Sequence, residues 1–458
     1  MTPAEITPDL PVSESPEAPP VAAPATPMVA PVSATERISS MDVVRGFALL
    51  GILAMNIVGF AFHPSVYGDP TVAGGSTGIN LWVYVFNSVM VDGKMRGIFS
   101  LMFGAGVLLL TSRAEQRGAG ALGADIHYRR MLWMILFGVV HAFVLWWGEI
   151  LYPYALLGLM LYPFRRLSVR ALLIFAVVLM LGTTGFSVGM AYGLRGKRDA
   201  AAKADAAAAQ GAKLTEEQTK AQKEWKDTLK EMKPDAAELK KTAEPFRGFL
   251  QLGGGFVSAI KARAPVVMRW HSMPYYSPMM WDLLCMMLLG MALLKAGVLS
   301  GERSFGFYRK LALIGLTIGI PLHIYGVSNM VRVNFDLIPT VFYWIPYQPA
   351  RIAVCLAYVS ILVMMVKAGA LRWLTSSLGA VGQMALTNYI MHSVICTTFF
   401  CVLGYFGKLE RHQIYYVVGS IWLFQMITSP IWLRHFRFGP MEWVWRSLTY
   451  WKRQPMRI

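Results

Sequence analysis

The sequence predicts an all-α polytopic membrane protein: a bundle of about ten transmembrane helices with both termini cytoplasmic and a soluble helical insert. Three observations support this class. Of the 458 residues, 55% are hydrophobic and only 15% are charged, a high apolar share for a soluble protein. The apolar residues form runs of about the 20 residues that a helix needs to cross a bilayer. Lys and Arg gather in short loops between the runs, where topology-setting charge belongs.

About ten runs qualify as membrane spans, and their order fixes a topology. Basic loops alternate with loops poor in Lys and Arg, so placing both termini in the cytoplasm puts every basic short loop inside. The long basic insert then lies outside, because long loops are translocated whatever their charge. The predicted spans are 44–62, 79–110, 131–147, 150–164, 169–192, 279–297, 311–327, 352–366, 378–406 and 415–432.

The chain divides into four parts. Residues 1–37 are rich in Pro and Ala, have no basic region followed by an apolar one as a secretory signal would, and are expected to form a disordered tail. Residues 38–194 form an N-terminal membrane half with about five spans. Residues 195–277 hold an extracytoplasmic helical insert, rich in Ala, Lys, Glu and Gln, and an interfacial segment. Residues 278–458 form the C-terminal membrane half.

Charge and cysteine content exclude some function classes. The net charge of +17 comes largely from topology-setting loops, so it does not indicate a nucleic-acid partner. The cysteines lie in apolar runs without paired spacing, which argues against a disulfide framework and against a zinc site. These cysteines are Cys285, Cys355, Cys396 and Cys401.

The hairpin formed by spans 131–147 and 150–164 contains two ionisable residues, His141 and Glu149. An ionisable group in hydrocarbon costs roughly 2.5–3.5 kcal/mol, so it usually faces the bundle interior, a cavity or a partner. His141 is a candidate general base reached from the outside. It is equally well explained as a histidine hydrogen-bonded to a neighbouring helix. Glu149 is a candidate to orient His141 or bind a cation, and a solvated interfacial carboxylate is the plainer alternative.

The first span carries three further polar candidates, and the loop after it carries another. Asp42 and Arg45 are three residues apart at the cytoplasmic boundary, so they can pair on one helix face. A boundary ion pair that sets topology is one explanation, and an Arg45 that binds an anionic cytoplasmic ligand such as a phosphate is the other. Asn56 lies deeper in the span. It either hydrogen-bonds to a neighbouring helix and stabilises helix packing, or is part of a polar cavity. His63 precedes a proline in the following loop.

The ninth span carries a polar stripe that includes Asn388 and His392, which are four residues apart and face the same way. No second pair of matching spacing is present, so a metal site is not expected. Asp282 and Arg351 each begin a span and are expected to be interfacial.

Three sequence blocks carry a resemblance to a known family. The first block is Met-Asp-Val-Val-Arg-Gly-Phe at 41–47, with Asn56 following. The second runs from His141 through Trp-Gly-Glu-Ile-Leu at 147–151. The third, the most specific, comprises 382–389, 429–433 and 438–450. Together the blocks span nearly the whole chain from about residue 38, and they resemble the YeiB-like bacterial inner-membrane proteins, whose C-terminal half is a domain of unknown function, DUF 418.

The Asp-x-x-Arg-Gly opening is also similar to a wider set of transmembrane acyltransferases, including the lysosomal heparan glucosaminide acetyltransferase. That resemblance implies transfer of an acyl group from cytosolic acyl-CoA, a cosubstrate rather than a tightly bound cofactor, to an extracytoplasmic acceptor. It would place Asp42 and Arg45 near the donor, with His141 as the catalytic histidine. Glu149 stands where YeiB-like chains usually have Asp, and His392 stands where they usually have Gln.

Two alternatives remain beside the acyltransferase. The first is a transporter or channel for a small hydrophilic solute, with the same polar residues lining its path. The second is a scaffold in envelope assembly that uses the soluble insert.

The relatives with acetyltransferase activity carry their histidine soon after the first span, where this chain has His63, but YeiB-like chains generally lack one there. The expected partners are the lipid bilayer, acyl-CoA and an envelope glycan or lipid acceptor, in the bacterial inner (plasma) membrane.

Overall fold

The computed structural model describes residues 37–234 and 255–458. Nearly all of the predicted tail, and residues 235–254 of the predicted insert, lie outside the described residues. Within the described part the chain is all helical and forms no β-strand, which confirms the all-α class. The α-helices are α1 Ser39–Ala61, α2 Gly78–Met90, α3 Lys94–Gln116, α4 Gly120–Val144, α5 Leu151–Leu161, α6 Val169–Ala209, α7 Glu216–Met232, α9 Gly255–Trp270, α10 Met273–Lys295, α11 Phe305–Arg332, α12 Leu337–Tyr343, α13 Tyr347–Lys367, α14 Arg372–Gln383, α15 Ala385–Cys396, α16 Arg411–His435 and α17 Pro440–Tyr450.

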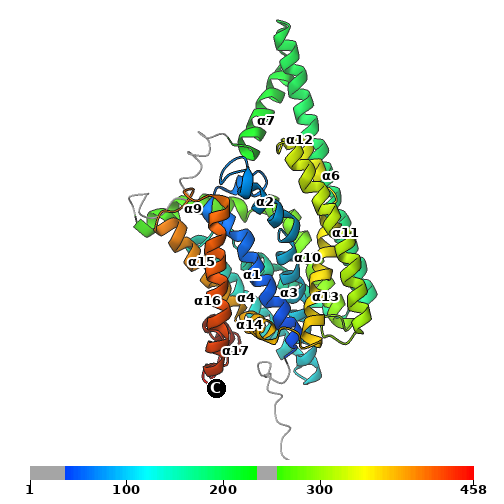
Figure 1. The fold of residues 1–458 in the computed structure, drawn as a ribbon, viewed down its shortest axis with the longest axis vertical. Helices are drawn as coiled ribbons and strands as arrows, with labels where there is room; N and C mark the ends of the chain where they lie inside the picture. The colour runs from blue at the N-terminus through cyan, green and yellow to red at the C-terminus, as the bar shows by residue number, and fades with distance from the viewer. Residues whose placement is uncertain (1–36, 235–254) are drawn as a thin grey trace, which may run out of the picture.

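Eight helical stretches in the described part are long and apolar enough to cross a membrane, so the chain is a polytopic membrane protein. The helices pack side by side in one bundle, with the start of α1 and the C-terminus at the same end (Figure 1). Large apolar side chains remain exposed along α6, α11 and α16, as expected for faces that contact lipid. The stretches are Ser39–Ala61, Gly78–Gln116, Val169–Ala209, Pro278–Lys295, Phe305–Arg332, Tyr347–Lys367, Ala385–Val402 and Arg411–His435.

The predicted hairpin is present as α4 and α5, which pack against each other, with one face of α4 exposed at the outside of the bundle. Helix α5 has 11 residues and therefore rises only about 16 Å, roughly half of a hydrocarbon core. Helix α9 covers the turn between α4 and α5. There Arg263 donates to the carbonyl of Leu145 at 3.0 Å, and Trp270 packs on Trp147. The hairpin therefore ends in protein rather than in solvent.

Small residues bring helix backbones close together, which is the usual source of tight packing where lipid offers no hydrophobic driving force. A Cβ atom added to Gly104 on α3 would lie 2.0 Å from the carbonyl oxygen of Met287 on α10, and one added to Gly290 would lie 2.0 Å from that of Leu101. Gly46 on α1 approaches α14 in the same way. These contacts fix α3 against α10 and α1 against α14.

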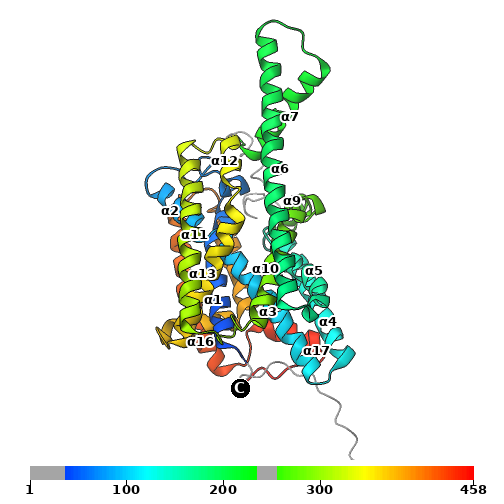
Figure 2. The same cartoon turned by 90° about the vertical axis from the view of Figure 1, so that its right-hand side faces the viewer.

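Helix α6 extends far beyond the bundle and carries the soluble part of the chain (Figures 1 and 2). Its 41 residues rise about 60 Å, twice the thickness of a hydrocarbon core. Helix α7 folds back along it, with Thr215 and Gln218 forming a capping box and Gln222 donating to Asp205 at 2.7 Å. The predicted insert thus begins as a direct continuation of a membrane helix.

Candidate functional site

One cavity, here called the inner chamber, has a volume of about 240 Å³ and lies among α1, α3, α4, α5, α14, α15 and α17. Its lining is of two kinds. Charged residues come from the start of α1, the end of α3, α4 and α17, and the rest of the lining is apolar and aromatic. The charged lining residues are Arg37, Asp42, Arg45, Arg113, Arg130, Glu442 and Arg446, with His127 beside them.

Arginines outnumber carboxylates in this charged part of the lining, which is called the chamber mouth here. Asp42 accepts from Arg45 at 2.8 Å and lies 3.8 Å from Arg37, so its charge is shared between two guanidinium groups. Arg130 lies over the ring of Trp445 at 4.0 Å and Arg446 over a phenylalanine ring at 4.5 Å. Neither forms an ion pair within the described ranges. Burial, with repulsion from Arg37, lowers the pKa of Arg446. The mouth therefore favours an anion.

Glu442 forms no ion pair with Arg130 or Arg446 in the described part of the chain, because its carboxylate caps a helix instead. Its carboxylate accepts from the backbone N–H groups of Leu386 at 2.6 Å and Thr387 at 3.2 Å, and from the Thr387 hydroxyl. Those N–H groups belong to the first turn of α15, where backbone N–H groups have no carbonyl acceptor within the helix. Burial raises the pKa of Glu442. It holds the α14–α15 elbow against α17 and forms one fixed wall of the mouth.

The apolar part of the lining, here called the inner end of the chamber, includes two tyrosines. Phe99, Phe103 and Met134 line it together with Tyr154 and Tyr389. The Tyr154 hydroxyl is hydrogen-bonded within the protein: it lies 2.6 Å from Ser100 Oγ and 3.3 Å from the carbonyl of Arg96. A ligand suited to this chamber has an anionic head and a narrow, less polar arm.

His141 lies next to the inner end of the chamber but does not line it. Its ring centroid is 5.2 Å from that of Tyr389, which does line it. The side chain is 2% exposed, and Nε2 lies 2.7 Å from the hydroxyl of Ser393 on α15. Within the described part of the chain, Nδ1 has no hydrogen-bond partner. His141 therefore has one nitrogen held by Ser393 and one nitrogen available.

Glu149 and His141 are not hydrogen-bonded to each other in the described structure. The Glu149 carboxylate instead accepts from the backbone N–H groups of Leu151 and Tyr152, the latter at 3.1 Å, and so caps α5. The residue is 4% exposed. Its observed contacts fix the start of α5, whose residues Leu151 and Tyr154 line the chamber.

The four other predicted site residues, Asn56, His63, Asn388 and His392, have hydrogen-bond partners other than His141. Asn388 donates to Ser429 at 3.1 Å, and His392 lies 2.7 Å from Gln425 Oε1, so both join α15 to α16. The backbone carbonyl of Asn56 accepts from Tyr67 at 3.5 Å. His63 begins the short 3-10 turn Pro64–Tyr67 and contacts Ser65 through Nδ1.

The sequence analysis did not predict several chamber residues as site residues, among them His127, Arg130, Glu442 and Arg446. His127 lies in a stretch predicted as a basic loop, but the structure places it inside α4, fully buried, with Nε2 2.9 Å from the carbonyl of Gly158. A carbonyl only accepts, so Nε2 carries the proton and Nδ1 carries the lone pair. The available signal was spacing: His127 and His141 are about four helical turns apart and so share a face of α4.

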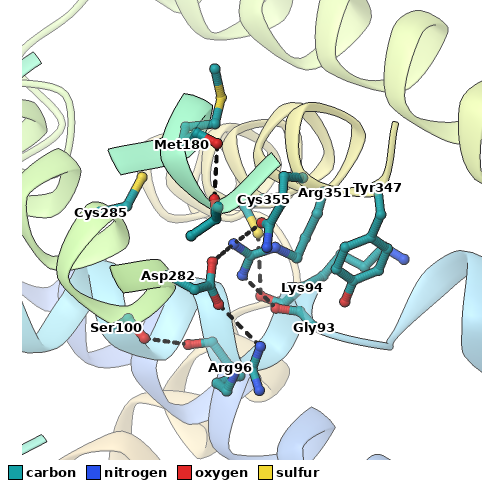
Figure 3. Close-up of polar contacts among 12 residues, drawn as sticks. Gly93, Lys94, Arg96, Ser100, Met180, Asp282, Cys285, Tyr347, Arg351 and Cys355 are labelled. Atoms are coloured by element: carbon teal, nitrogen blue, oxygen red, sulfur yellow. Dashed lines mark hydrogen bonds and ion pairs between the residues drawn. The ribbon is translucent and has the colours of Figure 1, made fainter. Parts of the chain in front are cut away.

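A second buried polar cluster lies between α3, α10 and α13, and it corrects the expectation that Asp282 and Arg351 are interfacial (Figure 3). Arg351 is 0% exposed and forms an ion pair with Asp282, which is 4% exposed. Arg96 donates to the other carboxylate oxygen at 3.0 Å. Both residues begin hydrophobic runs, so hydropathy places them at an interface, but their mutual pairing allows full burial. We call Arg96, Asp282 and Arg351 the arginine–aspartate cluster.

These features define the class as a multi-pass helical membrane protein with a cation-lined internal chamber. Residues 293–452 match the family described as "Protein of unknown function (DUF418)". The chain is 29% identical to YeiB of Escherichia coli K12 over 420 residues, covering 90% of this chain and 96% of YeiB. It is also 29% identical to YxaH of Bacillus subtilis 168 over 442 residues, covering 93% and 97%. These matches support a YeiB-like DUF418 family for the chain, with the family model itself covering its C-terminal part.

A third relative, named as a 39.9 kDa protein in the amylase 3′ region of Bacillus acidopullulyticus, is 25% identical over 429 residues, covering 93% of this chain and 98% of the relative. All three relatives carry the word "uncharacterized" in their names. No solved structure matches the chain.

Proposed function

We propose that the protein is a trans-bilayer acyltransferase of the bacterial inner (plasma) membrane. It takes an acyl group from cytosolic acyl-CoA, a diffusible cosubstrate, and passes it to a hydroxyl or amine of an envelope glycan or lipid on the outer side. The observation that carries this proposal is the inner chamber, with its arginine-rich mouth and its apolar inner end beside His141.

The chamber matches the chemistry of a thioester donor in two respects. The phosphates of the donor need charge-assisted donors, and guanidinium groups supply planar, paired N–H groups for them. Arg130 and Arg446 are the best placed, because both are stacked on aromatic rings and neither pairs with a described carboxylate. The acyl-bearing arm needs a narrow apolar passage, which Phe99 and Phe103 line.

In the proposed reaction His141 moves the proton. Its free nitrogen accepts the proton of the acceptor hydroxyl while that oxygen forms a bond to the thioester carbonyl carbon. The carbon–sulfur bond then breaks, and His141 returns the proton to the departing thiolate, so the products are the acylated acceptor and CoA thiol. Ser393 fixes the ring through its contact with Nε2. Tyr389, between the chamber and the ring, has to move for the thioester to reach His141.

Binding and transfer of labelled acyl-CoA by purified protein in lipid nanodiscs test the proposal. His141→Gln is expected to keep binding and lose transfer. Arg130→Gln is expected to weaken binding about 10- to 100-fold, because a hydrogen bond to a charged group contributes about 1.5–3 kcal/mol. Arg309→Gln, an exposed arginine of α11 away from the chamber, is the matched control. Absence of saturable binding to the wild type, with acetyl and longer acyl chains, would refute the proposal.

Solute transport is the second candidate, and the helix break between α2 and α3 favours it. The span Gly78–Gln116 is interrupted at residues 91–93, and transporters build substrate and ion sites from such half-helices. Accumulation of a labelled solute in proteoliposomes, by protein that binds no acyl-CoA, would favour transport over acyl transfer.

A further inference from the structure

The break between α2 and α3 places charged groups deep in the bundle. Residue 92 is an aspartate and residue 93 a glycine in the left-handed region, with φ +65°. A side chain at Gly93 would collide with the Tyr347 hydroxyl, since its Cβ would lie 1.9 Å from that oxygen. The break thus lets α13 approach the half-helix ends, with Tyr347 donating to Asp92 at 3.4 Å.

Lys94, the first residue of α3, is the least compensated charge at this break. It is 0% exposed, and its ammonium donates to the carbonyl of Ser88 at 2.7 Å. The ring of Tyr347 lies 5.8 Å away. An ammonium has three donors, and within the described chain no carboxylate oxygen lies within 4.0 Å of it. Its position at a helix N-terminus adds repulsion from the helix dipole.

The surrounding charges do not supply the missing anion. Arg96 and Arg351 already share Asp282, and an arginine stays protonated in a protein. Lys94 is therefore the cation of this group that can release its proton. The titratable and charged groups that face it from all packed elements are Tyr84 and Asp92 from α2 and the break, Arg96 from α3, Asp282 from α10, His323 from α11, and Tyr347, Arg351 and Cys355 from α13.

A small cavity of about 30 Å³ is lined by Ser88, Asp92, His323 and Tyr347 among others. Lys94 does not line it but reaches its wall, since its ammonium donates to the Ser88 carbonyl. The cavity has room for about one water molecule, given polar partners. His323 is 5% exposed, and its Nε2 has no hydrogen-bond partner in the described ranges. An orphaned imidazole nitrogen, a carboxylate and a water-sized space form a route along which a proton can move.

The small cavity has a larger neighbour. It shares Trp344 and Tyr347 with a larger cavity of about 370 Å³, which is also lined by Asp69, Lys233 and Thr340. Those last three come from the loop after α1, the end of α7 and α12, which the predicted topology places outside the membrane. Trp344 and Tyr347 therefore separate the small cavity from one that the predicted topology places toward the extracytoplasmic side, and a shift of these two side chains would join the two.

We propose that Lys94 is a proton-binding site within the membrane, and that it exchanges its proton with the outside through His323 and the small cavity. The arginine–aspartate cluster adjoins this site, since Arg351 donates to the Gly93 carbonyl, and it offers the proton no further carrier, because its guanidinium groups do not give up protons. The proton-binding site goes beyond the acyl-transfer proposal and does not depend on it. In a transporter, the same site would be the coupling site.

The test is charge displacement in proteoliposomes adsorbed to a solid-supported membrane. A step in external pH moves a proton partway into the membrane, so wild-type protein is expected to give a transient current without sustained flow. Lys94→Met, which keeps the length and buries a thioether in place of the ammonium, is expected to lose the current. Lys295→Met is the matched control. Lys295 ends α10 and its ammonium donates to the Leu167 carbonyl, away from the small cavity, so this variant is expected to keep the current.

His323→Phe provides a second, independent variant. It keeps the bulk of the ring and removes both nitrogens, so it is expected to slow the rise of the current without changing the total displaced charge. Each variant is compared only after size-exclusion chromatography shows the same folded species. No displacement current from the wild type, or the same current from wild type, Lys94→Met and His323→Phe, would overturn the proposal.

Discussion

The arginine–aspartate cluster makes a quantitative prediction for Asp282→Leu. Arg351 is 0% exposed, and its contacts in the structure are the Asp282 carboxylate, Gln348 Oε1 at 2.8 Å and the Gly93 carbonyl at 3.3 Å. Removing the carboxylate leaves a buried guanidinium with two neutral acceptors. Breaking a buried pair in this way costs about 3–5 kcal/mol, which corresponds to a shift of roughly a hundred- to several thousand-fold in the folding equilibrium.

The double variant Asp282→Leu/Arg351→Met separates the cost of an orphaned charge from the strength of the pair. Replacing a whole buried ion pair by apolar side chains is often neutral or stabilising. The remaining partner, Arg96, is 34% exposed, so it can reach polar surroundings when Asp282 is lost. The double variant is therefore expected to be more stable than Asp282→Leu alone.

Unfolding of the purified variants in one lipid composition measures these differences. Asp199→Leu is the control: it removes ion pairs with Arg195 at 3.7 Å and Arg198 at 2.6 Å, in which all three side chains are 41–53% exposed. Exposed pairs contribute about 0–1 kcal/mol, so this variant should unfold close to the wild type. Equal losses for Asp282→Leu and Asp199→Leu, or a double variant less stable than Asp282→Leu, would refute the reasoning about buried charge.

Two further predictions concern packing and the chamber wall. Gly104→Val should destabilise strongly, because even a Cβ would lie 2.0 Å from the Met287 carbonyl, whereas Gly106→Val meets open space and should unfold like the wild type; similar unfolding of both would contradict the packing argument. Burial raises the pKa of Glu442 above 4.5, so the native state holds its proton more tightly than the unfolded chain. That contribution to stability is complete below pH 4.5 and is lost as pH rises through the native pKa. Unfolding midpoints measured against pH should therefore fall more steeply above pH 4.5 for the wild type than for Glu442→Gln, and parallel profiles would count against it.

Much of the fold followed from local sequence patterns. Hydropathy alone gave the all-α membrane class, because runs of apolar residues have few other ways to satisfy their backbone groups. The pairing of Asp42 with Arg45 follows from their three-residue spacing on a helix, and the structure has this pair at 2.8 Å. These features depend on neighbours in sequence, which is why the sequence is sufficient for them.

The cluster and the chamber could not be obtained in this way, because they depend on packing between distant segments. Asp282 and Arg351 are 69 residues apart and meet only because α10 and α13 both pack on α3. Hydropathy gives each of them the same signal as an interfacial charge. Span 79–110 was predicted as one helix, although the Asp-Gly pair at 92–93 is a turn signal that marks the break before Lys94. The role of Glu149 as a cap depends on where α5 begins.

Helix α3 connects the two sites that the structure suggests. Its first turn carries Lys94 and Arg96, and its later turns line the inner chamber through Phe103 and Val107. The close backbone contacts at Gly104 hold α3 to α10, which carries Asp282, so the two helices are expected to move as one body. A change of charge at Lys94 would then act on the chamber through a rigid element rather than through a chain of flexible side chains. Acyl-CoA binding that depends on external pH in the wild type, and no longer does so in Lys94→Met, is the observation that this coupling requires.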